Sequence, residues 1–274
     1  MPRRIVLCAD DYGIAPGVNA AIRNLIERER INATSVMVVA PSFHRSDAAS
    51  LNRLRDKGVS IGLHLTLSAP FRPLSEGFSP LRNGAFLPIG AMLMRALLHR
   101  LNGAALAAEV TSQLRMFIHT FDCRPDFIDG HQHVHVFPQV RNAVLEAVHA
   151  LAPNAWIRQC GRTGSLRGRI GDRKGVLLDL LSKAFRERAA AVGVPFNPAF
   201  AGTYAYSDDA DFAALFPRFL EELPDGGVVM CHPGFVDGEL QRLDPLTTLR
   251  EKEYAYFMGE SFPKLLADRG VVLG

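Results

Sequence analysis

Cysteine is scarce and scattered in this 274-residue chain, and no CxxC pair occurs. The four cysteines are Cys8, Cys123, Cys160 and Cys231. Their spacing excludes a zinc ribbon and a thioredoxin-type motif. Cys8 and Cys231 lie inside apolar runs, so we expect buried free thiols and a reducing compartment.

Long apolar runs and a strong net charge are also absent. No apolar stretch reaches about 18 residues, so we expect no transmembrane helix and no membrane partner. The formal charge is +3 with 22% charged residues, a balance that argues against a disordered chain. The first residues, Met-Pro-Arg-Arg, lead directly into an apolar segment without the h-region of a signal peptide. We therefore expect a cytoplasmic enzyme.

Aromatic residues are few, at 8% of the chain, and they are sparse where arginine is dense. Much of the arginine excess lies in residues 158–188. Nucleic-acid grooves interleave aromatic side chains with their positive charges. The composition therefore disfavours a nucleic-acid partner, which would reveal itself by salt-dependent binding of an oligonucleotide.

Short apolar segments alternate with segments of helical spacing, the pattern of a parallel α/β protein. We expect strands in residues 4–9, 33–40, 59–67, 127–128, 155–158, 227–231 and 271–273, and a strand with a loop in residues 196–206. We expect helices in residues 16–30, 46–57, 93–101, 104–121, 138–151, 176–192, 208–223, 247–258 and 261–269. The pattern favours a single-domain parallel (β/α) barrel over residues 1–274, TIM-like or distorted, although an open sheet would share it.

Two segments show no clear period and are expected to be loops. Residues 69–90 are rich in proline, glycine and serine, and residues 161–173 are rich in glycine and arginine. The first is long for a simple connection, which favours a lid or a substrate-binding loop.

Three of the nine histidines, His131, His133 and His135, occupy alternate positions after the apolar Phe127-Ile128. In an extended segment their side chains would point to one side. Imidazole is the commonest neutral metal ligand. The triplet alone indicates a candidate metal site, with a histidine-rich surface turn as the alternative.

Acidic and imidazole side chains also follow other expected strands. Asp10 and Asp11 end the first strand, His64 lies near the end of the third, and His232 follows residues 227–231. Carboxylates there are costly unless they are paired or bind metal. The plainer alternatives are a helix cap for one aspartate and a buried core histidine at position 64. Because the carboxyl ends of parallel strands lie on one face, we expect all of these side chains to converge with the histidine segment.

One carboxylate with two imidazoles suits a catalytic divalent metal such as zinc, with a position open for water. A second carboxylate can take a proton from that water, and a histidine can protonate a leaving nitrogen. The set therefore suffices for hydrolysis of an amide. The alternatives are hydrolysis of another amide, an ester or a phosphoester, and a non-catalytic protein that binds sugar or metal.

Five motifs, in order over residues 9–234, resemble those of the YdjC-like carbohydrate deacetylases, whose best-understood branch is chitooligosaccharide deacetylase. They are Ala-Asp-Asp-Tyr-Gly at 9–13, Thr-Ser at 34–35, Gly-Leu-His-Leu-Thr-Leu at 62–67, Asp-Gly-His-Gln-His-Val-His-Val-Phe-Pro at 129–138 and Met-Cys-His-Pro-Gly at 230–234. The resemblance implies a (β/α) barrel enzyme that removes N-acetyl groups from amino sugars or short N-acetylglucosamine-containing oligosaccharides.

The resemblance also implies one divalent metal ion, zinc or magnesium, with a water on the metal as nucleophile. It places the metal on Asp11, His64 and His131. It implies that Asp10 is the general base and His232 the general acid. His133 or His135 would then line the pocket or support a ligand.

Other residues are weaker candidates. Tyr12 and Arg158 are expected to contact substrate or support the site, and a purely structural role for Arg158 is an equal alternative. Tyr204 and Tyr206 are candidates to face a substrate. Arg250 and Glu253, one helical turn apart, are interpreted as a surface ion pair. The expected partners are a small carbohydrate and, as one option for assembly, a second copy of the chain in a homodimer.

Overall fold

The strands are apolar runs that are covered on both faces, as the sequence pattern predicts. In the computed structural model, which describes residues 2–162 and 173–274, they all run parallel in one sheet. Among these residues the strands are β1 (Arg3–Tyr12), β2 (Ala33–Val36), β3 (Ser60–Leu65), β4 (Phe127–Gly130), β5 (Trp156–Ile157), β6 (Phe200–Ala201), β7 (Gly227–Cys231) and β8 (Val271–Leu273).

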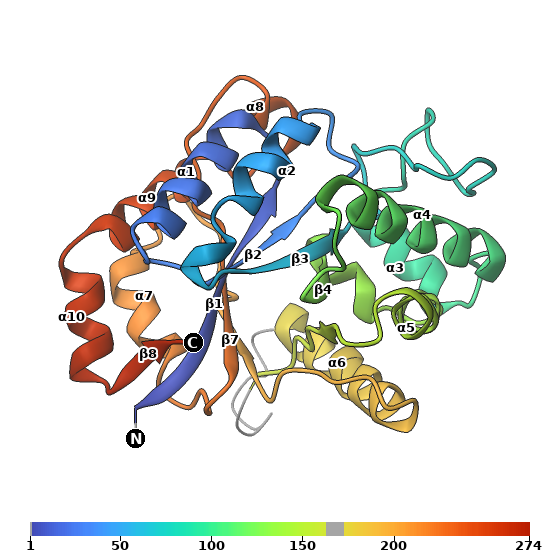
Figure 1. The fold of residues 1–274 in the computed structure, drawn as a ribbon. Coiled ribbons are helices and arrows are strands. Elements are labelled where there is room, and N and C mark those ends of the chain that lie inside the picture. The colour runs from blue at the N-terminus through green and yellow to red at the C-terminus, as the bar shows by residue number, and fades with distance from the viewer. Residues whose placement is uncertain (1, 163–172) are drawn as a thin grey trace.

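The sheet is curved, and β1 lies inside it, where it pairs with β2, β7 and β8 (Figure 1). The strand order is β5-β4-β3-β2-β1-β7-β6, and β8 pairs with the first part of β1. A bridge between Ile157 and Phe196 links β5 to the chain just before β6. The result is a distorted, incompletely closed (β/α) barrel, which confirms the expected fold class.

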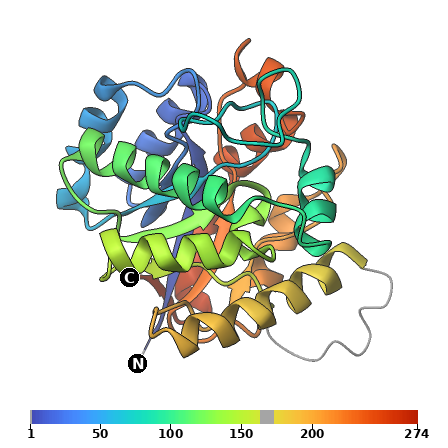
Figure 2. The same cartoon turned by 90° about the vertical axis from the view of Figure 1, so that its right-hand side faces the viewer.

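Helices lie outside the curved sheet on both flanks (Figures 1 and 2). They are α1 (Pro16–Glu27), α2 (Arg45–Asn52), α3 (Ile89–Leu97), α4 (Gly103–Phe121), α5 (Val140–Leu151), α6 (Arg173–Ala191), α7 (Phe212–Phe219), α8 (Leu240–Leu243), α9 (Thr248–Met258) and α10 (Ser261–Asp268), with short 3-10 turns η1 (Arg55–Lys57) and η2 (His131–Val136). The stripe Val18, Ile22 and Leu25 of α1 is buried, as its spacing predicts. No helix in the described ranges is long and apolar enough to cross a membrane.

Several boundaries differ from the predicted ones for local reasons. β2 ends at Val36 because the chain turns there, with the Ala40 amide donating to the Met37 carbonyl at 3.2 Å. Helix α7 starts later than predicted because Asp211 caps it, accepting from the Ala214 amide at 3.1 Å. Helix α3 starts at Ile89, four residues earlier than predicted.

The loop predicted at residues 69–90 is held by a buried carboxylate of α4. Glu109 accepts hydrogen bonds from the Leu74 and Ser75 amides at 3.1 and 2.7 Å. The aromatic ring of Phe71 meets that of His131 edge-on, with centroids 5.8 Å apart. The loop therefore covers one side of the histidine segment. Most of the loop predicted at 161–173 lies outside the described residues.

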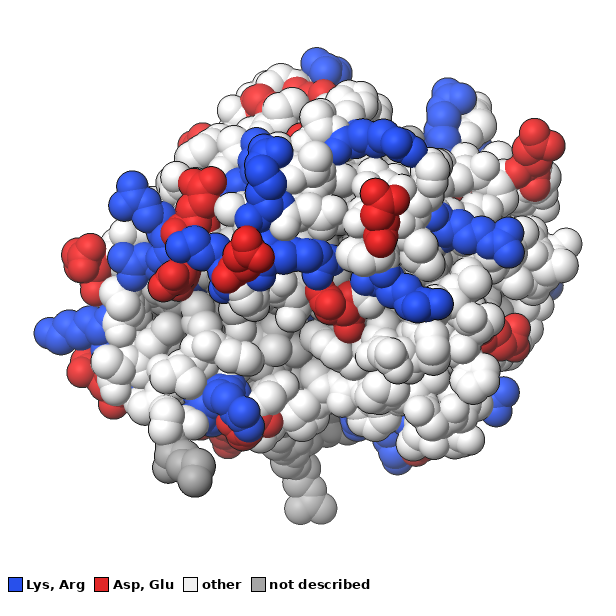
Figure 3. Space-filling model, in the orientation of Figure 1, with Lys and Arg blue, Asp and Glu red and all other residues white. Residues whose placement is uncertain are grey.

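Acidic and basic side chains are interspersed over the face seen in Figure 3. This mixture agrees with the near-neutral composition.

The sheet directs the carboxyl ends of β1, β3, β4 and β7 toward one side, and the predicted site residues lie there.

Candidate active site

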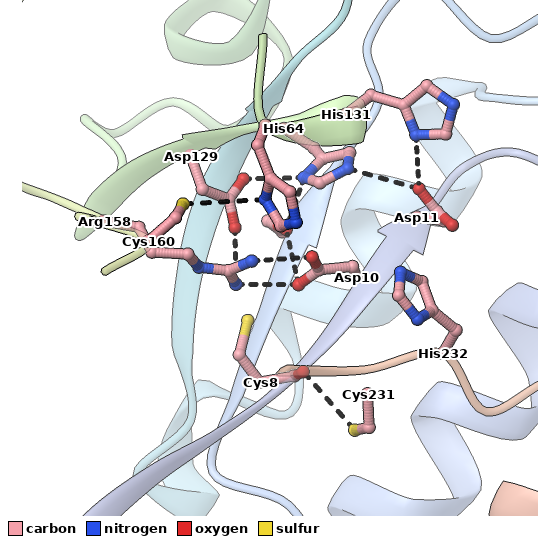
Figure 4. Close-up of polar contacts among 12 residues, drawn as sticks. Cys8, Asp10, Asp11, His64, Asp129, His131, Arg158, Cys160, Cys231 and His232 are labelled. Atoms are coloured by element: carbon pink, nitrogen blue, oxygen red, sulfur yellow. Dashed lines mark hydrogen bonds and ion pairs between the residues drawn. The ribbon is translucent and has the colours of Figure 1, made fainter. Parts of the chain in front are cut away.

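The end of β1 is irregular. Because of this irregularity, the side chains of the neighbouring Asp10 and Asp11 both point into the interior of the protein. The register between β1 and β2 shifts between Ala9 and Tyr12, and Asp11 has a φ of 71°. In a regular strand Asp10 and Asp11 would point to opposite faces. Aspartate tolerates the left-handed conformation better than most residues, and bulges often re-aim side chains beside active sites. Both carboxylates are buried and join the polar network of Figure 4.

Asp11, His64 and His131 come together as the sequence predicted. Oδ1 of Asp11 lies 3.2 Å from Nε2 of His64 and 3.0 Å from Nδ1 of His131. One ligand atom from each residue lies within 4.8 Å of the others, and all three residues are buried. A carboxylate oxygen and two imidazole nitrogens at this spacing fit a divalent metal ion.

The imidazole of His64 is oriented from behind by Asp129, which the sequence analysis did not single out. Oδ1 of Asp129 lies 2.6 Å from Nδ1 of His64, and the Ser35 hydroxyl lies 2.9 Å from the same nitrogen. This arrangement leaves Nε2 facing Asp11. Burial opposes a charge on His64, but Asp129 and the hydrogen bond to Asp11 outweigh it and raise the pKa of His64 to about 10.

Arg158 is fully buried and joins Asp10 to Asp129 (Figure 4). Its Nη1 and Nη2 atoms donate to the two oxygens of Asp10 at 2.6 and 2.7 Å. Nη2 also lies 2.6 Å from Oδ2 of Asp129. This bidentate pairing holds the Asp10 carboxylate in one orientation. Arg158 was expected either to contact substrate or to have a structural role. Its contacts with Asp10 and Asp129 match the structural role.

The model of the YdjC-like protein family matches residues 4–268. The chain belongs to the YdjC-like family.

Relatives of this YdjC-like chain match it along almost their whole length. It is 28% identical to a chitooligosaccharide deacetylase of Proteus mirabilis (strain HI4320), with 100% of this chain and 98% of the relative covered. It is 26% identical to a carbohydrate deacetylase of Geobacillus stearothermophilus, with 100% and 96% covered.

The fold also occurs in a crystal structure of a candidate cellobiose-phosphate cleavage protein from Enterococcus faecalis V583. The TM-score is 0.75 at 19% identity, and the match covers 100% of this chain and 97% of that one. The fold of the YdjC-like chain is therefore that of a known structure.

The histidine segment is not extended, so the expectation that His131, His133 and His135 point to one side is wrong. Residues His131–Val136 form η2, in which Gln132 and His133 have φ values of 52° and 59°. This turn buries Val134 and Val136 while it aims His131 at Asp11. The segment therefore forms a turn that buries Val134 and Val136 and brings His131 to Asp11. It does not form a strand with alternating side chains.

His133 and His135 lie behind the site. The Nε2 atom of His135 donates to the Arg158 carbonyl at 2.7 Å, and burial lowers the pKa of His135 to about 3. His133 meets the Phe200 ring edge-on at 5.5 Å, and its Nδ1 lies 3.5 Å from the Cys160 sulfur. His135 thus contacts the Arg158 backbone, and the role expected for His133 or His135 at the pocket or behind a ligand stays a prediction.

Helix α9 contributes two buried charged residues, so the surface ion pair predicted for Arg250 and Glu253 is wrong. Arg250 donates to Asp11, and Glu253 accepts from the His232 amide at 2.5 Å. Leu249 and Phe257 are buried on the same helix. Helical periodicity places these four residues on the inward face, which the near-absence of apolar patterning in α9 concealed.

His232 follows β7 and is half-buried beside an exposed aromatic ring. Its Nδ1 atom is buried and has no hydrogen-bond partner within the described ranges. The Tyr206 ring, 44% exposed, meets the His232 ring edge-on at 5.8 Å. Tyr204 instead donates its hydroxyl to Glu253 at 2.6 Å. Of the two tyrosines, Tyr206 is the one positioned beside His232.

Tyr12 contacts a different neighbourhood from Asp10 and Asp11. Its buried hydroxyl donates to the Asp47 carbonyl at 2.9 Å and accepts from Arg23 at 2.8 Å. These contacts tie β1 to α1 and to the start of α2. They offer no support for a substrate contact at Tyr12.

Proposed function

We propose that this YdjC-like chain is a metal-dependent carbohydrate deacetylase. It hydrolyses the N-acetyl group of amino sugars or short N-acetylglucosamine-containing oligosaccharides and releases acetate. The observation that carries the proposal is the Asp11, His64 and His131 donor set beside a separate buried carboxylate, Asp10. The relatives named as chitooligosaccharide and carbohydrate deacetylases support the class of substrate.

Asp11, His64 and His131 would hold one divalent metal ion, zinc or magnesium. Two imidazole ligands favour zinc, because magnesium prefers oxygen ligands. When bound, such an ion lowers the pKa of a water molecule and polarises the amide carbonyl.

Asp10 takes the proton of the attacking water. Arg158 holds both oxygens of Asp10 at 2.6 and 2.7 Å, so the carboxylate is oriented before substrate binds. His232 donates a proton to the leaving nitrogen, and its half-buried imidazole lies beside the exposed Tyr206 ring. That ring offers a flat apolar face to a sugar. A cytoplasmic location and a homodimer stay predictions.

The test is acetate release from N-acetylglucosamine and short chitooligosaccharides, before and after chelation and after addition of zinc or magnesium. Asp10→Asn is measured alongside a matched control, Asp126→Asn, which changes a partly exposed carboxylate just before β4. We expect acetate release to disappear with chelator and in Asp10→Asn, and to persist in Asp126→Asn.

The outcomes separate the parts of the proposal. If metal binds and no N-acetyl sugar reacts, the substrate class is wrong while the ligand assignment stands. If no metal binds, the assignment of Asp11, His64 and His131 is wrong.

A further inference from the structure

We infer that Arg250 is a positioning residue that holds the proposed metal ligand Asp11 in its binding orientation. The inference rests on the metal site proposed above. It concerns a contact between α9 and the end of β1, across 239 positions of sequence.

The guanidinium of Arg250 is fixed by contacts on two of its nitrogens. Nη2 donates to Oδ2 of Asp11 at 2.6 Å and to Oδ2 of Asp244 at 2.7 Å. Nε donates to the Leu246 carbonyl at 2.9 Å. The Arg250 side chain is fully buried, so these bonds act without competition from water.

This contact divides the Asp11 carboxylate between two tasks. Oδ2 is occupied by Arg250, and Oδ1 faces the nitrogens of His64 and His131. Only Oδ1 is left to complete the donor set. The left-handed backbone of Asp11 turns the side chain inward, and Arg250 then sets its rotation.

Arg250 also balances charge. Asp11 lies in a buried network with Asp10 and Asp129, whose charges Arg158 compensates. Without Arg250, Asp11 would lose its only guanidinium partner within the described ranges. A buried carboxylate left that way would be expected to change orientation or protonation.

The segment after His232 packs against the backbone of Arg250. The Gly234 amide donates to the Arg250 carbonyl at 3.1 Å. A Cβ at Gly234 would lie 2.9 Å from a Val18 methyl and 3.4 Å from Cδ of Arg250. The glycine therefore leaves room for the Val18 methyl group, and a Cβ there would meet the Arg250 side chain only at an ordinary van der Waals distance.

The test measures zinc affinity of the metal-free protein by competition with a chromogenic chelator. We expect Arg250→Met to bind zinc about 10–100-fold more weakly than the wild type. Arg250→Lys should lie between them, because an ammonium keeps the charge but lacks the guanidinium fork. The control is Arg55→Met, which breaks a part-buried ion pair with Asp126, has neither partner in the donor set and should bind zinc like the wild type.

A second readout separates positioning from a general structural effect. The visible absorption spectrum of the Co²⁺-loaded protein reports ligand geometry, and we expect it to change in Arg250→Met and to stay unchanged in Arg55→Met. Circular dichroism checks that each variant is folded. If Arg250→Met does not fold, Arg250→Lys and Asp244→Asn decide, because Asp244 holds Arg250 and is not one of the three proposed metal ligands.

Wild-type affinity and an unchanged Co²⁺ spectrum in the folded Arg250 variants would overturn the inference and leave the proposed metal site intact. Failure of the wild type to bind either Zn²⁺ or Co²⁺ would overturn the metal site, and the inference with it.

Discussion

Asp10 and Asp11 are neighbours in the chain, and each is 1% exposed, yet they lie in different surroundings. Both oxygens of Asp10 pair with Arg158, which also contacts Asp129. Asp11 divides its oxygens between Arg250 and two imidazoles. We call Asp10, Arg158 and Asp129 the base side, and Asp11, His64, His131 and Arg250 the metal side.

The comparison shows that two carboxylates of the same residue type have different environments, and this difference underlies the separate roles proposed for them. Burial favours the neutral form of Asp11, but the charges of Arg250 and His131 outweigh it and hold the pKa of Asp11 well below its usual range. The metal side therefore keeps Asp11 ionised among nitrogen donors. On the base side, both oxygens of Asp10 contact the guanidinium of Arg158.

The largest expected effects come from replacing the carboxylate of each side, Asp10 or Asp11, with an amide. Asp10→Asn should lower the rate of acetate release by about 10²–10⁴-fold, the range for loss of a general base, with zinc affinity nearly unchanged. Asp11→Asn should abolish stoichiometric zinc binding. Rate assays and zinc titrations on both variants check this, and loss of zinc binding in Asp10→Asn would show that the two sides are not separate.

Removal of the base-side guanidinium should cost the most stability. Arg158→Met leaves Asp10 and Asp129 buried with their shared cation gone, and we expect a loss of about 3–5 kcal/mol in the free energy of unfolding. Urea denaturation measures it. Arg55→Met, which removes a part-exposed ion pair, should cost about 1 kcal/mol or less. Equal losses in the two variants would contradict the prediction.

Protonation of His135, which contacts the Arg158 carbonyl, should lower the free energy of unfolding. Its pKa is about 3 in the folded protein and about 6.5 when unfolded, so the unfolded state binds more protons between these values. Stability is fully present above about pH 6.5 and falls as the pH drops toward 3, by up to about 1.4 kcal/mol per pH unit. Urea unfolding at pH 7, 6 and 5 should show a shallower dependence in His135→Gln, and identical slopes would refute this assignment.

The smallest expected effect concerns Ser35, whose hydroxyl contacts both sides. The Ser35 hydroxyl lies 2.9 Å from Nδ1 of His64 and 3.5 Å from Oδ1 of Asp10. Because Asp129 still orients His64, Ser35→Ala should weaken zinc binding by less than about tenfold, the equivalent of one ordinary hydrogen bond. A chelator competition assay checks it, and a loss as large as that of Asp11→Asn would mean that Ser35 orients His64.

Local patterns predicted much of the framework. The bounds of β7 and β8 are those predicted, and Cys8 and Cys231 are buried free thiols as expected. These features depend on runs of apolar residues that a window of the sequence contains. The convergence of strand ends followed from parallel topology alone, because their carboxyl ends share one side of the sheet.

Other features had no such local signal. The positive φ of Asp11 and the η2 turn of His131–Val136 replace the alternation that the sequence suggested. Asp129 stood in a recognised motif without an assigned role. The φ of Asp11, the η2 turn and the contact of Asp129 depend on packing against other strands, which a single segment does not encode.

The sequence by itself determined which segments are buried and which acidic and imidazole side chains end them, because periodicity and strand ends are local properties. The tertiary structure decided the partners of those side chains. Arg158 reaches Asp10 across 148 positions and Arg250 reaches Asp11 across 239. The curvature of the sheet and the docking of α9 bring these charges together, and the buried carboxylates need such compensating cations.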